Sequence, residues 1–412
     1  MKYGCIGEHL KHSFSKEIHN ALADYEYEIH EVAKDELDCF MAEGDFSAIN
    51  VTIPYKEAVI KHLYEIDDKA RLIGAVNTVV NRGGRLYGYN TDFYGMSMLI
   101  SHACVEIVGK KVVILGTGGT SKTSYAVAKS LGAREVIKVG REKKGDAITY
   151  GELYESHTDA EVIINTTPVG MFPSIFSSPI DIDKFPCLCG VIDAVYNPLR
   201  TPLVISARER GVKAEGGLYM LVAQAVRASE IFIDKVYGED TLEAVFSRIV
   251  REKENIVLIG MPSSGKSTVG GIIAQKMGRE LIDTDDEIVR RAKMSIPEIF
   301  KLRGESYFRE LEAEVIRDAA ALTGKVISTG GGAILRKENV RALRENGRIY
   351  FIDRPLEYLI PTDTRPLSGT KEAIEERYRE RYGLYRAAAT VTVPSTTTAE
   401  DTARDIMKEF SL

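Results

Sequence analysis

The sequence predicts a protein of the α/β class, in which parallel sheets are covered by helices. Short runs rich in β-branched residues alternate with longer segments of helical period, and this alternation recurs along the chain. A glycine-rich turn joins a strand-like run to a helix-like segment twice, at residues 116–121 and 260–267. The length of 412 residues allows about two to three domains.

The first alternation covers about residues 1–100. Strand-like and helix-like segments follow one another there, in the order KYGCIG, KEIHNALADY, YEIHEVA, DELDCFMAE and SAINVTIP. Short β-branched runs of this kind form strands, and the longer pieces between them form helices. We therefore expect the first α/β domain over residues 1–100.

A second alternation starts at residues 110–116, KKVVILG, and continues through SKTSYAVAKSLG to REVIKVGR. This is the size of one βαβ unit. Further strands are expected at EVIINTT and GVIDAVY, and a long helix begins after a Gly-Gly pair at GLYMLVAQAVRASEIFI. We place this Rossmann-like domain at residues 101–217 and expect helices of about residues 218–250 to return to the first domain.

The third alternation follows the charged segment RIVREKEN, where a new strand, NIVLIG, begins. We place the main boundary at about residues 250–254. The last domain, residues 254–412, should contain a parallel sheet.

Composition excludes several classes of protein. Hydrophobic residues make up 44% and charged residues 28%, which is typical of a folded globular protein. The net charge of -6 and the lack of a long basic cluster argue against nucleic acid or an anionic membrane as partner. Five scattered cysteines and the absence of an export signal favour the cytoplasm. We expect small-molecule substrates. The sequence does not predict the oligomeric state.

Residues 260–267 match the phosphate-binding pattern G-x-x-x-x-G-K-[ST], between a strand and a helix. Glycines let backbone N–H groups point at phosphate oxygens, the lysine neutralises phosphate charge, and the serine hydroxyl binds Mg²⁺. We therefore expect ATP with Mg²⁺. The residues expected to bind ATP here are Ser263, Ser264, Gly265, Lys266, Ser267 and Thr268.

Further motifs follow the phosphate loop. They are LIDTDDEI, GESYFR, a strand leading into three glycines, TRPL and RYGLY. In this order they resemble the shikimate kinase family over about residues 255–412. The resemblance implies that Asp285 holds the ring hydroxyls of shikimate and accepts the proton of the 3-hydroxyl, and that Asp283 joins Ser267 in binding Mg²⁺.

The same resemblance implies further contacts. Arg309 and Arg381 would bind the substrate carboxylate, the backbone at Gly331 would approach the ring, and Arg365 would reach the ATP phosphates from a lid. A planar guanidinium suits a carboxylate because it donates two parallel hydrogen bonds. An alternative for Arg309 is an ion pair with Glu305 or Glu312 on one helix face. The lid is shorter than is usual in the family and lacks an arginine before TRPL, so Tyr358 is an alternative partner for adenine.

The turn at residues 116–121 is placed where a dinucleotide pyrophosphate binds. We expect Gly116, Gly118, Gly119 and Thr120 to contact it. The next strand ends at Arg141, where an NAD-binding protein usually has an acidic residue. Arg141 favours a 2′-phosphate and therefore NADP over NAD, although Glu142 lies beside it.

The first 100 residues contain HSFSKEIHN, INVTIPYK, GAVNTVV and GYNTD. This set resembles the shikimate dehydrogenase family, over about residues 1–250. The resemblance implies that Lys56 and Asp92 are the catalytic pair and that Gly217 and Met220 lie beside the nicotinamide. The residues that it implies for substrate binding are Ser13, Ser15, Thr52, Asn77, Asp92, Tyr196 and Gln224. A lysine suits ketone reduction because it polarises the carbonyl and donates a proton.

The two resemblances together predict a bifunctional enzyme of aromatic precursor synthesis. It would reduce 3-dehydroshikimate with NADPH and phosphorylate the resulting shikimate with MgATP. One alternative is an NAD-dependent quinate or shikimate dehydrogenase fused to a kinase for another small polyol. A second is a ligand-sensing regulator built from retired enzyme domains, which the presence of Lys56, Asp92, Lys266 and Asp285 disfavours.

Overall fold

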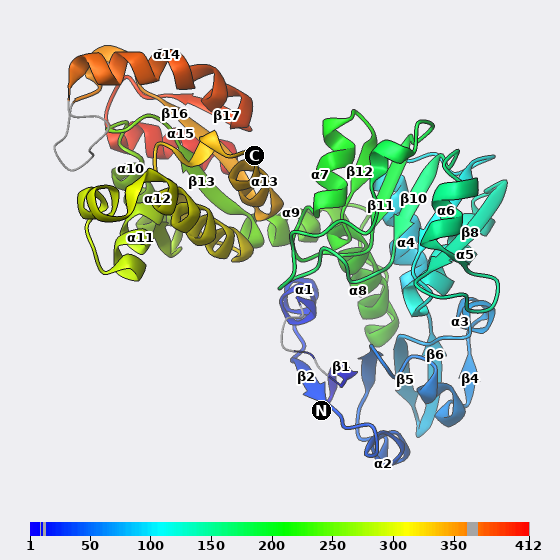
Figure 1. Cartoon of the computed structure of the whole chain (residues 1–412). Helices are drawn as coiled ribbons and strands as arrows, with labels where there is room; N and C mark the ends of the chain where they lie inside the picture. The colour runs from blue at the N-terminus through cyan, green and yellow to red at the C-terminus, as the bar shows by residue number, and fades with distance from the viewer. Residues whose placement is uncertain (9, 11–13, 361–369, 412) are drawn as a thin grey trace. The chain divides into compact units, whose positions relative to one another are not determined.

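The computed structural model describes residues 1–8, 10, 14–360 and 370–411 (Figure 1). The chain forms two compact units, Met1–Ile249 and Val250–Leu412. The division falls within helix α9 (Thr241–Lys253), which buries Leu242, Val245 and Ile249. Each unit has its own sheets and cores.

The first sheet of the N-terminal unit has the strand order β2-β1-β3-β5-β6-β4. β1 pairs in parallel with β2 and β3, whereas β5 is antiparallel to β3 and β6. The alternation predicted parallel pairing, but a tight turn at Gly83 and Gly84, both with positive φ, joins β5 to β6 as a hairpin. The strands are β1 (Tyr3–Gly7), β2 (Tyr27–Glu31), β3 (Ala48–Val51), β4 (Glu65–Ile66), β5 (Thr78–Arg82) and β6 (Arg85–Tyr89).

Apolar residues cover both faces of this sheet, since neighbouring strand residues point to opposite sides. Ile6 and Ile49 pack with Met41 of α2 on one side. Cys5 and Ala48 pack with Phe232 of α8 on the other side, although α8 is far along the chain. The helices of this region are α1 (Ser15–Leu22), α2 (Leu37–Glu43), η1 (Ala58–His62), α3 (Asp68–Ile73), α4 (Asp92–His102) and α8 (Leu218–Ile233).

The second sheet of the N-terminal unit is entirely parallel, with the order β12-β11-β10-β7-β8-β9. Counted from β7, this is the Rossmann order 3-2-1-4-5-6, in which ligands bind where the order reverses, outside the carboxyl ends of the strands. That point lies between β7 and β10. The elements are β7 (Lys111–Leu115), α5 (Gly119–Ser130), β8 (Glu135–Gly140), β9 (Ile148–Thr149), α6 (Tyr150–Ser156), β10 (Val162–Asn165), η2 (Ile182–Lys184), β11 (Gly190–Asp193), α7 (Pro202–Glu209) and β12 (Lys213–Glu215).

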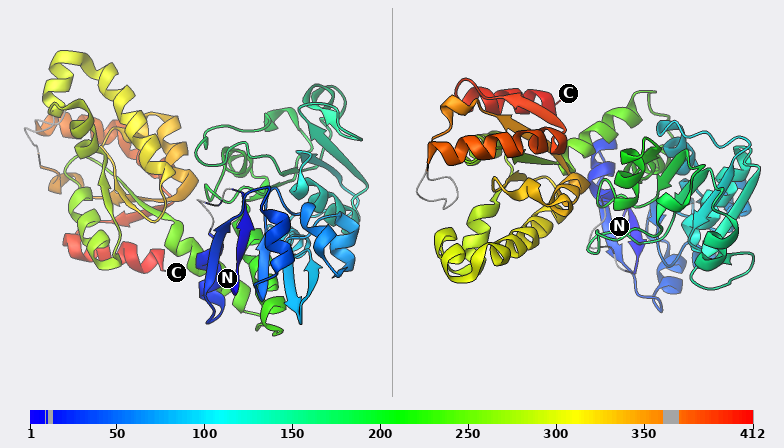
Figure 2. Two further views of the ribbon diagram at one scale, coloured as in Figure 1. Left: turned by 90° about the horizontal axis from the view of Figure 1, so that it is seen from below. Right: turned by 45° about the horizontal axis from the view of Figure 1, so that its top comes forward.

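The C-terminal unit has one parallel sheet, with the order β14-β15-β13-β16-β17. Helices cover both faces (Figure 2). Ile256 of β13 packs with Ile273 of α10 on one face, and Val257 packs with Ile316 of α12 on the other. The strands are β13 (Asn255–Ile259), β14 (Leu281–Asp283), β15 (Val326–Ser328), β16 (Gly347–Asp353) and β17 (Val391–Pro394). The helices are α10 (Lys266–Met277), α11 (Thr284–Ala292), α12 (Ile296–Ala321), η3 (Ala333–Leu335), α13 (Lys337–Asn346), η4 (Leu356–Tyr358), α14 (Lys371–Ala388) and α15 (Ala399–Phe410).

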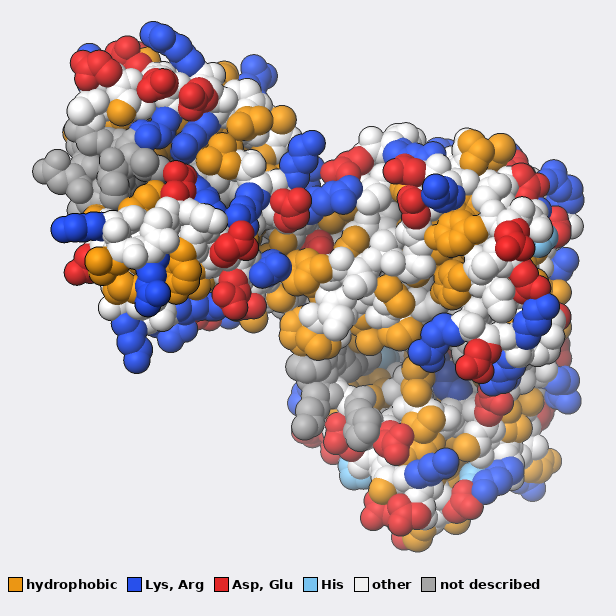
Figure 3. All heavy atoms as spheres, viewed as in Figure 1, with side chains coloured by type: hydrophobic (Ala, Val, Ile, Leu, Met, Phe, Trp, Pro, Cys, Tyr) orange, Lys and Arg blue, Asp and Glu red, His pale blue; other side chains and the backbone are white. Residues whose placement is uncertain are grey.

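The surface carries charges of both signs. On the face shown in Figure 3, basic and acidic side chains are interspersed. Among the described residues, no helix has the length and apolar character needed to span a lipid bilayer.

Glu345, near the end of α13, is a buried carboxyl group whose side-chain oxygen Oε2 has no hydrogen-bond partner among the described residues. Burial raises its pKa from 4.5 to about 8. Because the folded-state pKa is above the unfolded one, stability falls as the pH rises from about 4.5 toward 8.

We predict that Glu345→Gln stabilises the C-terminal unit by about 1 to 3 kcal/mol at neutral pH, because the ionisation penalty is removed. Calorimetric unfolding of the full chain at pH 7 and at pH 4.5 measures this. The gain should shrink at the lower pH. The exposed Glu338→Gln, on the same helix, is the control and should change little.

Candidate functional site

A cavity of about 630 Å³ lies in the N-terminal unit, between segments of its two sheets. Most of the residues predicted for reduction line this cavity. They are Ser15, Thr52, Lys56, Asn77, Asp92, Thr120, Tyr196, Gly217, Met220 and Gln224. Ser13 lies outside the described residues. The lining also includes Asn50, Met171, Phe172 and Asn197, which the sequence did not indicate.

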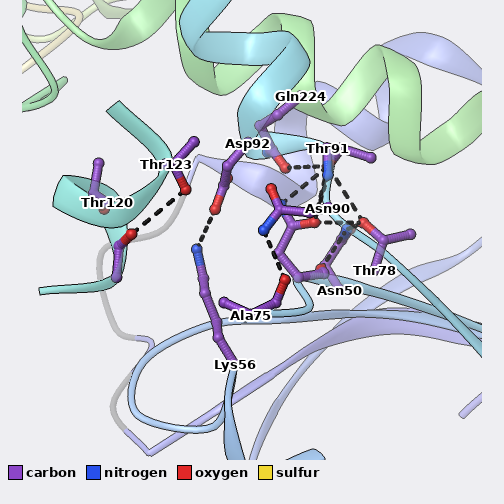
Figure 4. A network of polar contacts seen from close by, with 12 residues as sticks. Asn50, Lys56, Ala75, Thr78, Asn90, Thr91, Asp92, Thr120, Thr123 and Gln224 are labelled. Atoms are coloured by element: carbon purple, nitrogen blue, oxygen red, sulfur yellow. Dashed lines mark hydrogen bonds and ion pairs between the residues drawn. The ribbon is translucent and has the colours of Figure 1, made fainter. Parts of the chain in front are cut away.

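An ion pair stands at the cavity wall. Lys56 Nζ lies 2.5 Å from Asp92 Oδ2, and the two side chains are only 19% and 10% exposed (Figure 4). Asp92 is the first residue of α4, where the partial positive charge of a helix N-terminus favours a carboxylate. The pair therefore keeps a cation at the cavity, where it can polarise a carbonyl and donate a proton.

Two amide side chains, those of Asn77 and Gln224, are joined through Thr91. Thr91 N donates to Asn77 Oδ1 at 2.8 Å, and Asn77 Nδ2 donates to Thr91 Oγ1 at 3.0 Å. Thr91 Oγ1 is also 3.3 Å from Gln224 Oε1 (Figure 4). These contacts hold the Asn77 and Gln224 amide groups in fixed orientations at the cavity. Oriented amide groups of this kind are suited to hydrogen bonds with the hydroxyls of a ring.

Asn50 also belongs to this polar network. Its Oδ1 accepts from Tyr27 Oη at 2.7 Å, and its Nδ2 donates to Thr78 Oγ1 at 3.2 Å. The only sequence signal for Asn50 was a polar residue within the apolar strand AINV, directly before TIPYK.

The glycine-rich turn between β7 and α5 fits a dinucleotide. A Cβ at Gly118 or Gly119 would meet nothing within 4 Å, so space is open in front of the N-terminus of α5. Gly116 has φ +109°, and a Cβ there would collide with Thr166. Such a turn can bring backbone N–H groups close to a pyrophosphate.

Gly217 and Asn197 also line the cavity. A Cβ at Gly217 would collide with the carbonyl oxygen of Ala194, so only glycine fits there. Asn197 Oδ1 is buried and has no hydrogen-bond partner among the described residues. This oxygen is therefore an acceptor suited to an N–H donor, such as a carboxamide.

Arg141 is exposed directly after β8 and does not belong to the cavity lining. Two nearby lysines are held by acids, since Lys138 pairs with Asp146 and Lys143 lies 2.6 Å from Glu152. Because Lys143 is already paired with an acid, it is less able to offset the negative charge of Glu142 beside Arg141.

In the C-terminal unit, the phosphate-binding turn lies between β13 and α10. Gly265, with φ +89°, caps the helix, and Lys266 is its first residue. Lys266 Nζ is buried and donates to the carbonyl oxygens of Gly260 and Met261 at 3.0 and 2.9 Å.

The other residues predicted for ATP differ in their exposure and contacts. Ser263 Oγ donates to Ile360 O at 2.8 Å. Ser264 is buried, and the exposed Ser267 and Thr268 follow Lys266 on the helix. Arg365 lies outside the described residues.

Ser267 Oγ donates to Asp283 Oδ2 at 2.6 Å, so the two groups predicted for Mg²⁺ are adjacent. Among the described residues, no three His, Cys, Asp or Glu side chains gather as a metal site. A hydroxyl and a carboxylate fit Mg²⁺, which commonly takes few protein ligands and completes its shell with phosphates and water.

A polar region surrounds the three glycines after β15. A Cβ on Gly330 would lie 2.6 Å from Asp285 Oδ1 and 3.0 Å from Glu312 Oε1, which places both carboxyl groups beside this glycine. Arg381 Nη1 donates to Gly331 O at 3.2 Å, while its buried Nε has no hydrogen-bond partner among the described residues. A carboxylate ligand would satisfy that donor.

Arg309 makes both of the ion pairs given as its alternatives in the sequence. It lies 2.7 Å from Glu312 and 3.1 Å from Glu305, and its guanidinium packs against Gly332. Glu312 is buried, and burial raises its pKa while Arg309 opposes this effect. Glu312 is thus a residue of this region that sequence reasoning treated only as a helix-face partner.

The fold and the two sites define a Rossmann-type oxidoreductase joined to a P-loop kinase. Residues 5–79 match the family model described as shikimate dehydrogenase substrate binding domain, and residues 262–411 match the one described as shikimate kinase. A shikimate dehydrogenase (NADP⁺) of Clostridium perfringens is 36% identical over 272 residues, which cover 60% of this chain and 97% of that protein. The chain belongs to the shikimate dehydrogenase family and carries a shikimate kinase domain after it.

Solved structures agree with this assignment. Shikimate dehydrogenase 1 from Peptoclostridium difficile is 36% identical, with a TM-score of 0.56, over 60% of this chain and 98% of that one. The Thermus thermophilus shikimate 5-dehydrogenase in complex with NADP(H) and shikimate is 27% identical, with a TM-score of 0.55, over 60% of this chain and 99% of that one.

We predict that Asp283→Asn raises the Mg²⁺ concentration needed for half-maximal binding of a fluorescent ATP analogue by about tenfold, because a charged oxygen ligand is lost. Titration of the full chain measures the effect. Asp286→Asn, an exposed neighbour on α11, is the matched control. Equal Mg²⁺ dependence in both variants would contradict the assignment of Asp283.

Proposed function

We propose that this protein catalyses two consecutive reactions. The N-terminal unit reduces 3-dehydroshikimate to shikimate with NADPH, and the C-terminal unit phosphorylates the 3-hydroxyl of shikimate with MgATP. The observation that carries the proposal is the Lys56–Asp92 ion pair on a cavity lined by hydroxyl and amide groups, in a chain that also has a P-loop.

In the reduction, NADPH supplies a hydride to the carbonyl carbon. Lys56 donates a proton to the carbonyl oxygen, which becomes the new hydroxyl, and the ion pair with Asp92 orients the Lys56 side chain. Ser13 and Ser15 bind the substrate carboxylate. The residues proposed for its ring and hydroxyls are Thr52, Asn77, Asp92, Tyr196 and Gln224.

Residues at the carboxyl edge of the second sheet would hold NADPH. The residues proposed for it are Gly116, Gly118, Gly119, Thr120, Arg141, Gly217 and Met220. The open space before α5 and the close approach of Gly217 to Ala194 support this placement. Arg141 serves the 2′-phosphate, and its exposure leaves it accessible to that group.

In the phosphorylation, MgATP supplies the phosphoryl group. Asp285 accepts the proton of the attacking hydroxyl, and Arg309 and Arg381 hold the carboxylate with the backbone of Gly331 against the ring. Ser267 and Asp283 hold Mg²⁺. The residues proposed for ATP are Ser263, Ser264, Gly265, Lys266, Ser267, Thr268 and Arg365. The buried Nε of Arg381, which finds no hydrogen-bond partner in the described part of the chain, supports a carboxylate ligand.

We assign a substrate domain to residues 1–100 with the helices of about 218–250, an NADP domain to 101–217 and a kinase domain to 254–412. The packing of α8 against β1 and β3 supports the first assignment. We also propose a cytoplasmic location, since four exposed free cysteines are compatible with a reducing compartment.

A coupled assay tests the proposal. Purified protein receives 3-dehydroshikimate and NADPH, with 340 nm absorbance followed, and then ATP, with ADP formation followed. Substrate-dependent NADPH oxidation and shikimate-dependent ADP release are both expected. The same assay with NADH in place of NADPH tests the NAD-dependent alternative, which predicts faster reduction with NADH. Absence of either activity would refute the corresponding half.

We predict that Lys56→Ala lowers reduction by at least about a thousandfold and leaves phosphorylation of supplied shikimate unchanged, because general acid and electrostatic contributions are lost together. Lys266→Ala should do the reverse. Steady-state rates of both reactions measure this. Lys61→Ala and Lys276→Ala, which remove exposed lysines nearby, are the controls. Loss of both activities in one variant would contradict independent sites.

A further inference from the structure

We propose that Asp193 is a positioning residue for dinucleotide binding, because it holds the two loops that form one wall of the dehydrogenase cavity. Asp193 is the last residue of β11 and does not line the cavity itself. The inference rests on the proposed reductase function and assigns part of the affinity for NADPH to a residue that does not itself line the cavity.

The Asp193 carboxylate accepts three hydrogen bonds in the interior. Asn165 Nδ2 donates to Oδ1 at 2.9 Å, and the backbone N–H of Val195 donates to the same oxygen at 3.0 Å. Thr201 Oγ1 donates to Oδ2 at 2.7 Å. Asp193 thus joins the end of β11 to the end of β10 and to the first turn of α7, on which Thr201 is the cap.

The first loop that these bonds hold is 194–201. It begins at the hydrogen bond from Val195 N and ends at Thr201, and Ala194, Tyr196 and Asn197 of this loop line the cavity. Gly217 N donates to Val195 O at 2.8 Å, and Gly217 packs directly on Ala194. Movement of this loop would therefore move the surface proposed for the nicotinamide.

The second loop is held through Asn165. Asn165 Oδ1 accepts from Thr167 N at 3.0 Å and from Thr167 Oγ1 at 2.7 Å, which fixes the start of the segment leading to Met171 and Phe172. Phe172 N then donates to Asn197 O at 2.9 Å and so connects the two loops. The hydrogen-bonded residues Asp193 and Asn165 therefore hold both loops in place.

A buried carboxylate is costly unless its oxygens are hydrogen-bonded. Asp193 is fully buried, and burial raises its pKa to about 6, an effect that the three donors oppose. An asparagine of the same shape could still accept from Asn165 and Val195 through Oδ1. An alanine would leave three buried donors without an acceptor, which is the more damaging change.

The test compares Asp193→Ala with Asp193→Asn in the full chain. NADPH binding is measured by the fluorescence of the dinucleotide, without turnover. We expect the Kd to rise at least tenfold for Asp193→Ala and less than threefold for Asp193→Asn. The binary Kd for shikimate should rise less than threefold in both, because most of its proposed contacts come from other elements.

Asp181→Ala is the matched control, since Asp181 caps the short helix η2 of the same domain and is exposed. Thr201→Val removes one of the three bonds to Asp193, and a rise of about threefold is expected. If near-ultraviolet circular dichroism shows that Asp193→Ala is unfolded, the NADPH Kd of Thr201→Val tests the inference instead.

An NADPH Kd within twofold of wild type in Asp193→Ala, or in Thr201→Val where the alanine variant is unfolded, would overturn the inference. So would an equal loss in Asp181→Ala. If wild-type protein neither binds nor oxidises NADPH, the proposed reductase function itself is wrong. The two failures are thus distinguishable.

Discussion

The ion pair between Lys56 and Asp92 joins the loop after β3 to the first turn of α4 and faces a cavity shared with the second sheet of the same unit. Two charges removed from most of the solvent carry a desolvation cost, which their attraction and the helix N-terminus offset. The pair therefore requires that the loop after β3 and the start of α4 be held at a fixed separation. The polar contacts of Thr91 and the packing of α8 against the first sheet meet that requirement.

A second constraint is shared by both units. Parallel strands direct their carboxyl ends to one edge of a sheet, where helix N-termini and turn backbones also meet. Gly118 and Gly265 lie at such edges, each as the cap of a helix. Asp193 and Asp283 end strands at the corresponding edges, one as an anchor for loops and the other beside a serine hydroxyl. Acidic residues at the ends of parallel strands thus have different contacts, according to how deeply each is buried.

The sequence predicted the α/β class and most helices because hydrophobic period is a local property. It also predicted Lys266, since the requirements of a phosphate loop fall within eight consecutive residues. Lys56 and Asp92 were predicted from motifs, and the structure brings them together. Their assignment as catalytic groups stays a prediction.

The features that the sequence did not predict depend on contacts between residues that are far apart in the chain. The antiparallel β5–β6 hairpin was missed because the alternation of strands and helices was taken to hold throughout the first domain. Asn50 stood out in the sequence only as a polar residue in an apolar strand, and Glu312 only as a helix-face partner of Arg309. Their burial, and that of Asp193, beside Tyr27, Arg309 and Asn165 became clear only in the fold. Local patterns do not show which distant residues will pack beside such groups.

The two units, which meet at Ile249 and Val250, belong to one polypeptide chain. Each copy of this chain carries one reductase unit and one kinase unit, so its synthesis cannot alter their ratio. Within this chain, the two steps can therefore be balanced only through the turnover number and saturation of each unit.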